Sequence, residues 1–85
     1  MPTKHRDAKF TVRQRQVVRL IAEGCSNLEI AQCLGISPRT AKAHSDTLRI
    51  KLGVARQRHI PAAFRQTTGE DPHALEDLGT ALGAR

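Results

Sequence analysis

Three pairs of helix start and stop signals divide the first two-thirds of this 85-residue chain. Each start is a hydroxyl residue that can cap the first amides of a helix, and each stop is a glycine suited to a left-handed helix end. The starts are Thr11, Ser26 and Ser37, and the stops are Gly24, Gly35 and Gly53. These signals predict three helices, at about residues 12–23, 27–34 and 38–52, separated by short turns.

The start signals have specific cap chemistry. Gln14 and Glu29 each stand three residues after a cap hydroxyl, which is the spacing of the capping box. Pro38 follows Ser37 at the first helical position, where its missing N–H costs nothing. A fourth helix is expected to begin at about 57–60 and to end before Gly69, since Pro61 is tolerated only near a helix start.

The composition limits the kind of core that the chain can build. With two Phe and no Trp or Tyr, the core must consist of Leu, Ile, Val and Ala, which suits small packed helices. The expected fold class is therefore all-α, with four helices. In the segment 38–52, one stripe at helical spacing should pack on the preceding helices, and it comprises Ala41, Ser45, Leu48 and Leu52. The other side is free to meet a partner, and it comprises Arg39, Lys42, Ala43, Asp46, Arg49 and Ile50.

The charge is unevenly distributed along the chain. The net charge is +6, and thirteen of the fourteen Lys and Arg residues lie within residues 1–65. A basic body predicts a polyanion partner, most often nucleic acid, although a merely solvated surface would have the same charge. Residues 66–85 hold four of the eight acidic residues. This suggests that residues 70–77 fold back on the basic face and inhibit DNA binding.

Several classes of protein are excluded. No stretch of 18 apolar residues could span a membrane, and the basic N-terminus is not followed by the apolar region of a secretory signal. Cys25 and Cys33 are expected to be reduced thiols of a cytoplasmic protein, and no ligand cluster predicts a metal or another cofactor. No arrangement of side chains predicts catalysis, so the chain is expected to be no enzyme.

The second and third predicted helices fit a helix-turn-helix. They are joined by the tight turn Gly35-Ile36-Ser37, and the longer second member presents basic residues near its start. In such a pair the first helix crosses the phosphate backbone, and the first turns of the second helix reach base edges in the major groove. The pattern therefore predicts double-stranded DNA as the partner.

Several separated blocks then resemble the LuxR/FixJ-type DNA-binding domain of bacterial transcription regulators. The blocks are Phe10 to Gly24, Ser26 to Ala31, Leu34, Ile36-Ser37, Arg39-Thr40, Lys42, His44, Leu48 and Lys51 to Val54. They occur in order at fixed spacing, and the resemblance extends over about residues 10–66. It implies a four-helix domain whose third helix, at about 38–52, is the recognition helix.

The resemblance also implies roles for individual residues. Lys42 and Ala43 fall where the family meets base edges, with Asp46 one turn further on. Residues expected near phosphates are Arg39, Thr40, Arg49 and Lys51, and the amides around Ser26 and Asn27. From their charge alone, Arg56 and Arg58 either contact phosphate as well or form only a solvated face. Helix four often forms a dimer contact in the family, which here implies Ile60, Ala63 and Phe64. A homodimer on DNA is expected, and a sensor or polymerase partner is possible.

The sequence departs from the family pattern at five positions. Asp46 places an acid in the proposed DNA face, where it could accept from a cytosine amino group or repel phosphate. Ala41 stands where the family favours Val, and Ser45 where a larger apolar residue is common, so both loosen the packing of the third helix. Gln57 stands where Arg is common, and Pro61 replaces an apolar residue of helix four.

These observations predict three regions. Residues 1–9 are expected to form a flexible basic arm, residues 10–67 the DNA-binding domain, and residues 68–85 an acidic, frayed tail. In the tail, Leu75, Leu78 and Leu82 have the spacing of a short amphipathic helix. The function predicted for the chain, as a stand-alone or excised effector domain, is sequence-specific DNA binding in transcriptional regulation. The alternative is a protein-interaction module that keeps the fold and acts on a regulator or a polymerase subunit.

Overall fold

The computed structural model describes residues 10–74. Four α-helices lie within this range, α2 (Val12–Ala22), α3 (Asn27–Leu34), α4 (Pro38–Leu52) and α5 (Ile60–Thr68). Two 3₁₀-helices accompany them, η1 (Gln57–His59) and η2 (Pro72–Ala74). Since residues 10–74 contain no strand, the predicted all-α class is confirmed. None of these helices has the length and apolar character that a membrane span would need.

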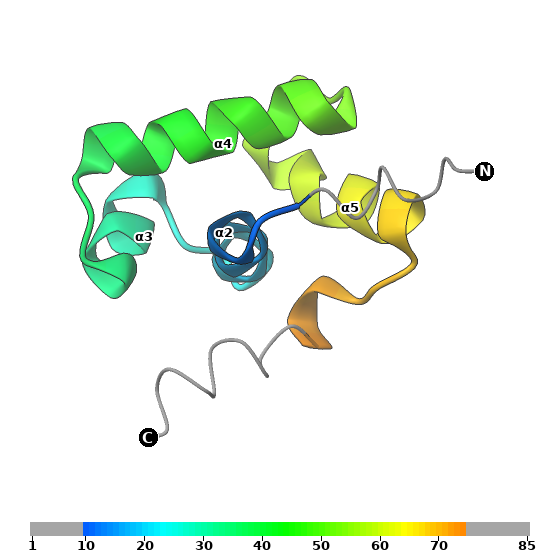
Figure 1. The fold of residues 1–85 in the computed structure, drawn as a ribbon, viewed down its shortest axis with the longest axis horizontal. Coiled ribbons are helices and arrows are strands. Elements are labelled where there is room, and N and C mark those ends of the chain that lie inside the picture. Colours follow the sequence, from blue (N-terminus) through cyan, green and yellow to red (C-terminus); the bar gives the residue numbers. More distant parts are fainter. Residues whose placement is uncertain (1–9, 75–85) are drawn as a thin grey trace.

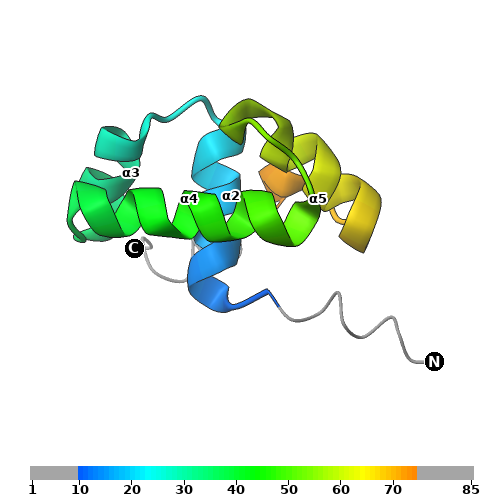
Figure 2. The same ribbon diagram turned by 90° about the horizontal axis from the view of Figure 1, so that it is seen from above.

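The longest helix, α4, lies across the other three. Figures 1 and 2 show α4 as one layer, with α3 beneath one end, α2 crossing beneath its middle and α5 beneath the other end. The turn between α3 and α4 is short, so these two helices pack against each other directly. This arrangement leaves one long side of α4 without a covering element among the described residues.

The helix ends follow the local signals in the sequence. The Thr11 Oγ1 accepts from the Gln14 amide at 3.0 Å, and the Gln14 side chain accepts from the Thr11 amide at 2.9 Å. The Ser26 and Glu29 pair forms the same capping box at the start of α3. At the other end of α3, Gly35 adopts the left-handed conformation with φ 68°, which favours glycine. Ser37 likewise caps the start of α4, so the three predicted starts are confirmed.

The core lies between α4 and the layer beneath it. Its fully buried apolar side chains are Val17, Val18, Ile30, Ala41, Leu48, Ile60 and Phe64. The Phe10 and Phe64 rings meet edge to face, with their centroids 5.1 Å apart. The predicted stripe of α4 is confirmed, since Ala41, Ser45 and Leu48 are buried and Leu52 packs at the core's edge.

The fourth helix also forms where it was expected. The chain turns through η1 and enters α5, with Pro61 in the first turn, where the proline has no helical hydrogen bond to break. Gly69 ends α5 with φ 80°. The helix therefore accommodates the proline without a kink in its interior.

The expected dimer contact needs correction. Ile60 and Phe64 have no exposed surface, because both side chains fill the core of the monomer. Only Ala63, among the three residues proposed for this contact, is partly exposed. Ile60 and Phe64 therefore stabilise the fold and cannot meet a second copy without leaving the core.

The start of the expected tail also differs from its prediction. After α5, η2 packs against α2, and Pro72 is fully buried. Glu70 pairs with Arg15 of α2, and Asp71 lies 3.5 Å from Arg65 of α5. These two acids thus pair with arginines of α2 and α5, and neither forms an ion pair with the basic residues of α4. Residues 1–9 and 75–85, including Leu75, Leu78, Leu82, Glu76 and Asp77, lie outside the described residues.

Candidate nucleic-acid interface

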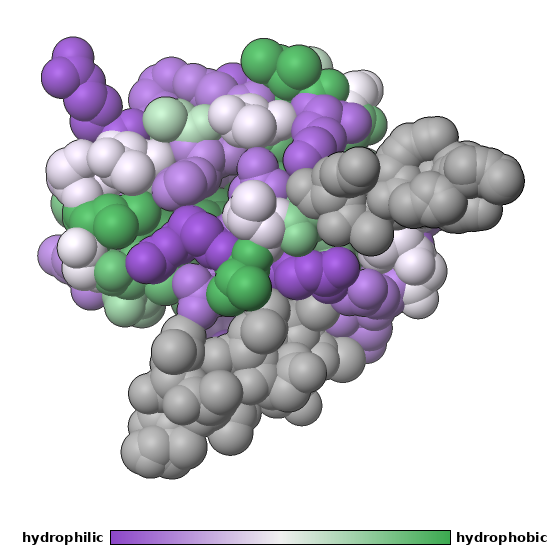
Figure 3. Space-filling view, viewed as in Figure 1, coloured by the Kyte–Doolittle hydropathy of each residue, from purple (hydrophilic) through white to green (hydrophobic). Residues whose placement is uncertain are grey.

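The uncovered side of α4 is the candidate interface, and we call it the outward face. Its exposed members are Arg39, Lys42, Ala43, Thr47 and Ile50, and Asp46 lies among them with partial exposure. Figure 3 shows mixed polar and hydrophobic surface along the edge of the molecule that α4 occupies. Ile50, an apolar member of this face, is 82% exposed. Thr47 was missed in the sequence, although its position four residues after Ala43 places it on this face.

The N-terminal end of α4 is held by its cap. The Ser37 hydroxyl accepts from the Thr40 amide at 3.0 Å and donates to the Thr40 hydroxyl at 3.0 Å. Arg39 stands between them in sequence, exposed, and no acidic side chain of residues 10–74 pairs with it. The start of α4 therefore combines a positive helix end with an exposed guanidinium.

Asp46 is the centre of a charged network on the outward face. Its Oδ2 accepts from Lys42 Nζ at 3.0 Å, and its Oδ1 accepts from Arg49 Nη2. Arg49 also donates from Nη1 to the Ala55 carbonyl, at 3.2 Å, in the turn after α4. The hydrogen bonds from Lys42 and then Arg49 lower the pKa of Asp46 below its ordinary value, since both stabilise the charged carboxylate.

Lys51 lies on a different side of α4 from this network. Its Nζ is 4.8 Å from the centroid of the Phe10 ring and 3.5 Å from Gln14 Oε1, near the start of α2. The ammonium therefore helps to join α4 to the beginning of the domain. The structure does not bring Lys51 together with Lys42 and Asp46.

The start of α3 holds the two residues expected to cap a phosphate. Ser26 is exposed, and its hydroxyl accepts from the Glu29 amide at 3.2 Å. Asn27 is half-buried, and its Oδ1 has no hydrogen-bond partner among the described residues. The two residues thus lie at a positive helix end.

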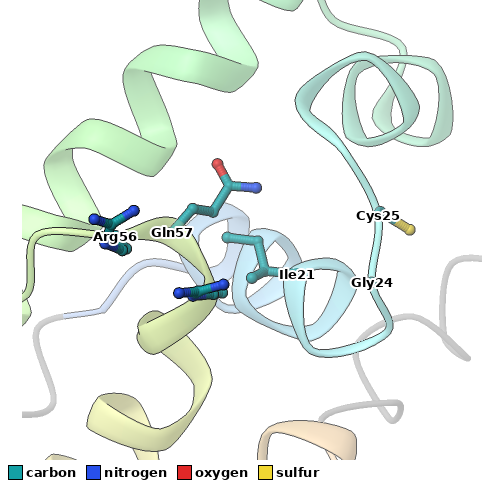
Figure 4. Close-up of a pocket in the computed structure, with 6 residues that line it drawn as sticks. Ile21, Gly24, Cys25, Arg56 and Gln57 are labelled. Carbon is teal, nitrogen blue, oxygen red and sulfur yellow. The ribbon is translucent and has the colours of Figure 1, made fainter.

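Arg56 and Arg58 flank a cavity behind η1. Figure 4 shows this cavity between Arg56 and Gln57 on one side and the loop containing Gly24 and Cys25 on the other. Its volume is about 390 Å³, and Ile21 also lines it. Neither arginine pairs with an acidic side chain of residues 10–74. Both guanidiniums are therefore exposed cations at the margin of α4.

The thiol of Cys25, whose residue lines this cavity and whose sulfur points away from it in Figure 4, is not activated for reaction. Burial, together with the nearby Cys33, Glu29 and Glu23, raises the pKa of Cys25. A raised pKa reduces the fraction of thiolate, which is the reactive and metal-binding form. Residues 10–74 also hold no group of three His, Cys, Asp or Glu side chains that could bind a metal ion.

Two departures from the family pattern contact each other. The Ser45 hydroxyl, which is almost fully buried, donates to Gln57 Oε1 at 2.7 Å. The serine thus replaces lost apolar packing with a hydrogen bond between α4 and η1. In the sequence, Ser45 and Gln57 were recognised only as two separate departures, because a residue pattern does not show that positions twelve residues apart are in contact.

A short capped helix, a glycine turn and a longer helix with one buried face define a helix-turn-helix DNA-binding domain. The family described as "Bacterial regulatory proteins, luxR family" matches residues 8–61, more than half of the chain. The chain therefore belongs to the luxR family of bacterial regulatory proteins. Membership of this family, together with relatives that are named as transcriptional regulators, supports the predicted function of DNA binding in the regulation of transcription.

Individual relatives are similar over the same region. The transcriptional regulatory protein MctR of Rhizobium johnstonii is 48% identical over 45 residues, which are 53% of this chain and 21% of MctR. The transcriptional regulatory protein UhpA of Escherichia coli is 44% identical over 50 residues, which are 59% of this chain and 26% of UhpA. A putative HTH-type transcriptional regulator of Mycobacterium bovis is 49% identical over 46 residues, 54% of this chain and 5% of that protein. The chain thus spans a small part of these relatives, and no solved structure matches it significantly.

Proposed function

We propose that α4 enters the major groove of double-stranded DNA and reads a specific sequence with its first turns. Lys42 and Ala43 are the proposed base contacts, one through an ammonium donor and one through a methyl group. The observation that carries this proposal is the division of α4, since one face is buried and the other presents Arg39, Lys42 and Ala43 outward. A helix of 15 residues is about 22 Å long, which suits an extended groove contact.

Further contacts with the phosphates are proposed for α4 and for the segments before and after it. They are Arg39, Thr40, Arg49 and Lys51 of α4, Arg56 and Arg58 after it, and the amides at Ser26 and Asn27. Lys and Arg displace the counterions that condense on DNA, so binding should weaken steeply as salt is added. Contacts of this kind fix the position of the domain and leave the choice of sequence to α4.

We further propose that two copies act together on DNA. One small domain makes few base contacts, and two half-sites about one DNA turn apart would double them. Because Ile60 and Phe64 are buried, the contact between copies must use other surface of the domain. A sensor or polymerase partner, a cytoplasmic location beside bacterial DNA, and the lack of an enzymatic activity belong to the same proposal.

The experiment that tests the proposal is selection from a pool of duplexes with random cores. Binding is measured by fluorescence anisotropy across a salt series, and the bound fraction is sequenced. Enrichment of one sequence, with an affinity that falls as salt rises, is the expected result. Inverted half-sites in the enriched sequence would support two copies.

Absence of duplex binding at low salt would overturn the proposal. The alternative function, interaction with a regulator or a polymerase subunit through the same fold, would then account for the outward face. Binding of random duplexes without any enriched sequence would remove base reading by Lys42 and Ala43 and leave only backbone contact.

A further inference from the structure

An acidic side chain in the middle of a DNA-facing helix is the feature that the proposed function does not explain. Asp46 lies on the outward face, one turn after Lys42 and half-exposed. A carboxylate near DNA phosphates is repelled by them, which opposes binding. The position therefore needs a role that a neutral residue would not supply.

The contacts of Asp46 indicate such a role. Its two carboxylate oxygens engage different cations, Oδ2 with Lys42 Nζ at 3.0 Å and Oδ1 with Arg49 Nη2. Both partners lie on α4, one turn before and one turn after the carboxylate, at the i,i+4 and i,i+3 spacings. The acid is therefore placed to orient two long side chains at once.

The network continues beyond α4. Arg49 donates from Nη1 to the Ala55 carbonyl at 3.2 Å, directly before Arg56. Ser45 adds a second link between α4 and this region, because its hydroxyl donates to Gln57 Oε1 at 2.7 Å. Asp46, through Arg49, thus connects Lys42, which is proposed to read a base, to the turn that carries Arg56.

We propose that Asp46 is a positioning residue, which holds Lys42 and Arg49 in place for DNA and so determines sequence specificity without reading a base. This inference rests on the proposed function and names the source of its specificity. Lysine has a long and flexible side chain whose freedom is lost on binding, and a carboxylate that holds it beforehand reduces that loss. The network therefore favours the target sequence over other DNA.

Two other roles for Asp46 make different predictions. If the acid only repels phosphate, its removal should tighten binding to every duplex. If it accepts from a cytosine amino group, its removal should relax the preference at one base pair, independently of Lys42. A positioning role predicts weaker discrimination that depends on Lys42.

The experiment uses the sequence enriched by the wild-type chain and a random duplex of equal length. The variants are Asp46→Asn, which removes the charge, and Asp46→Glu, which keeps a carboxylate. Asp71→Asn is the matched control, because it makes the same chemical change at an acid that pairs with Arg65 of α5 and with no cation of α4 among the described residues. Circular dichroism and thermal unfolding establish that each variant is folded before its affinities are measured across a salt series.

Asp46→Asn is expected to lower the ratio of specific to random affinity by about tenfold, the scale of one good base contact. Asp71→Asn should leave this ratio unchanged, and Asp46→Glu should recover most of it. In a Lys42→Gln background, the further change Asp46→Asn should add little, since the side chain to be positioned is already gone.

Two outcomes would overturn the inference alone. In one, Asp46→Asn tightens binding to both duplexes by the same factor, so the ratio of specific to random affinity does not change, as in Asp71→Asn. In the other, the loss is confined to one base pair and is equally large with and without Lys42. If the wild-type chain enriches no sequence, the proposed function itself is wrong. The positioning role of Asp46 is then wrong as well, because it depends on base recognition.

Discussion

The two faces of α4 use the same backbone for different purposes. On the face toward the core, Ala41 and Leu48 have no exposed surface, whereas Ile50, two residues after Leu48, is 82% exposed. The charged residues Arg39, Lys42 and Asp46 lie on the outward face, where water or a partner can meet them, whereas Lys51 contacts Phe10 on another side of the helix. The difference teaches that folding and recognition can be assigned to separate side chains of one helix.

The energies of the two faces should separate in the same way. Apolar burial contributes about 25 cal/mol for each Å² removed from water, so the inner face dominates stability. Exposed ion pairs contribute about 0–1 kcal/mol at most, so the outward face should contribute little to folding. Substitutions can therefore test whether the division is as sharp as the exposures suggest.

The largest expected effect follows from Leu48→Ala. This change leaves a cavity in the core and should lower the free energy of unfolding by about 2–5 kcal/mol. Urea denaturation followed by circular dichroism measures the loss. Leu48→Met, which nearly conserves volume, should cost less than about 1.5 kcal/mol and shows that the cavity is the cause.

Ile50→Ala is the control for this comparison. The side chain is exposed on the same helix, so its removal should change the free energy of unfolding by no more than about 0.5 kcal/mol. Equal losses for Leu48→Ala and Ile50→Ala would break the distinction between the two faces.

The second largest effect, on DNA affinity, is expected from Lys42→Ala. If Lys42 reads a base, its loss should weaken binding to the enriched sequence by about 1–3 kcal/mol and relax the preference at that base pair. The free energy of unfolding should stay nearly unchanged, because Lys42 is exposed. Anisotropy titrations on the enriched duplex and its single-base variants measure the change. An unaltered sequence preference would show that Lys42 does not read a base.

The division of α4 was largely predictable from the sequence, because local signals carry it. Ser37, Pro38 and Gly53 mark the ends of the helix, and each acts within its own turn. Helical spacing then separates the buried Ala41 and Leu48 from the outward residues. Signals of this kind depend on neighbours in the chain, which a sequence displays directly.

Contacts between distant segments were not predictable in this way. The aromatic cluster explains the error at Phe64, because its ring contacts Phe10 and lies 5.8 Å from the Arg15 guanidinium. The charge of Glu70 suggested a tail, yet its ion pair with Arg15 joins positions 55 residues apart. Only the packing of α2 against α5 and η2 brings these groups together.

A smaller effect is expected from Ser45→Ala, which tests the link between α4 and η1. The change removes the donor to Gln57 Oε1, and a typical hydrogen bond contributes about 1 kcal/mol to stability. A double-mutant cycle with Gln57→Ala should show coupling of similar size. Additive losses would mean that the two departures from the family pattern do not compensate each other.

The smallest effect on stability concerns the titration of Asp46 on the outward face. Its pKa is lowered from 3.8 by Lys42 first and Arg49 second, so the unfolded chain binds a proton more readily than the folded chain. The stability that this carboxylate contributes is fully present above the unfolded value and is lost as the pH falls through the folded value. Carbon-13 NMR of the Asp46 carboxyl should give a midpoint below 3.8, and Lys42→Gln should raise it more than Arg49→Gln does. A midpoint that neither substitution moves would show that the network is not formed in solution. Asp46 would then not fix the position of the Lys42 side chain on the outward face.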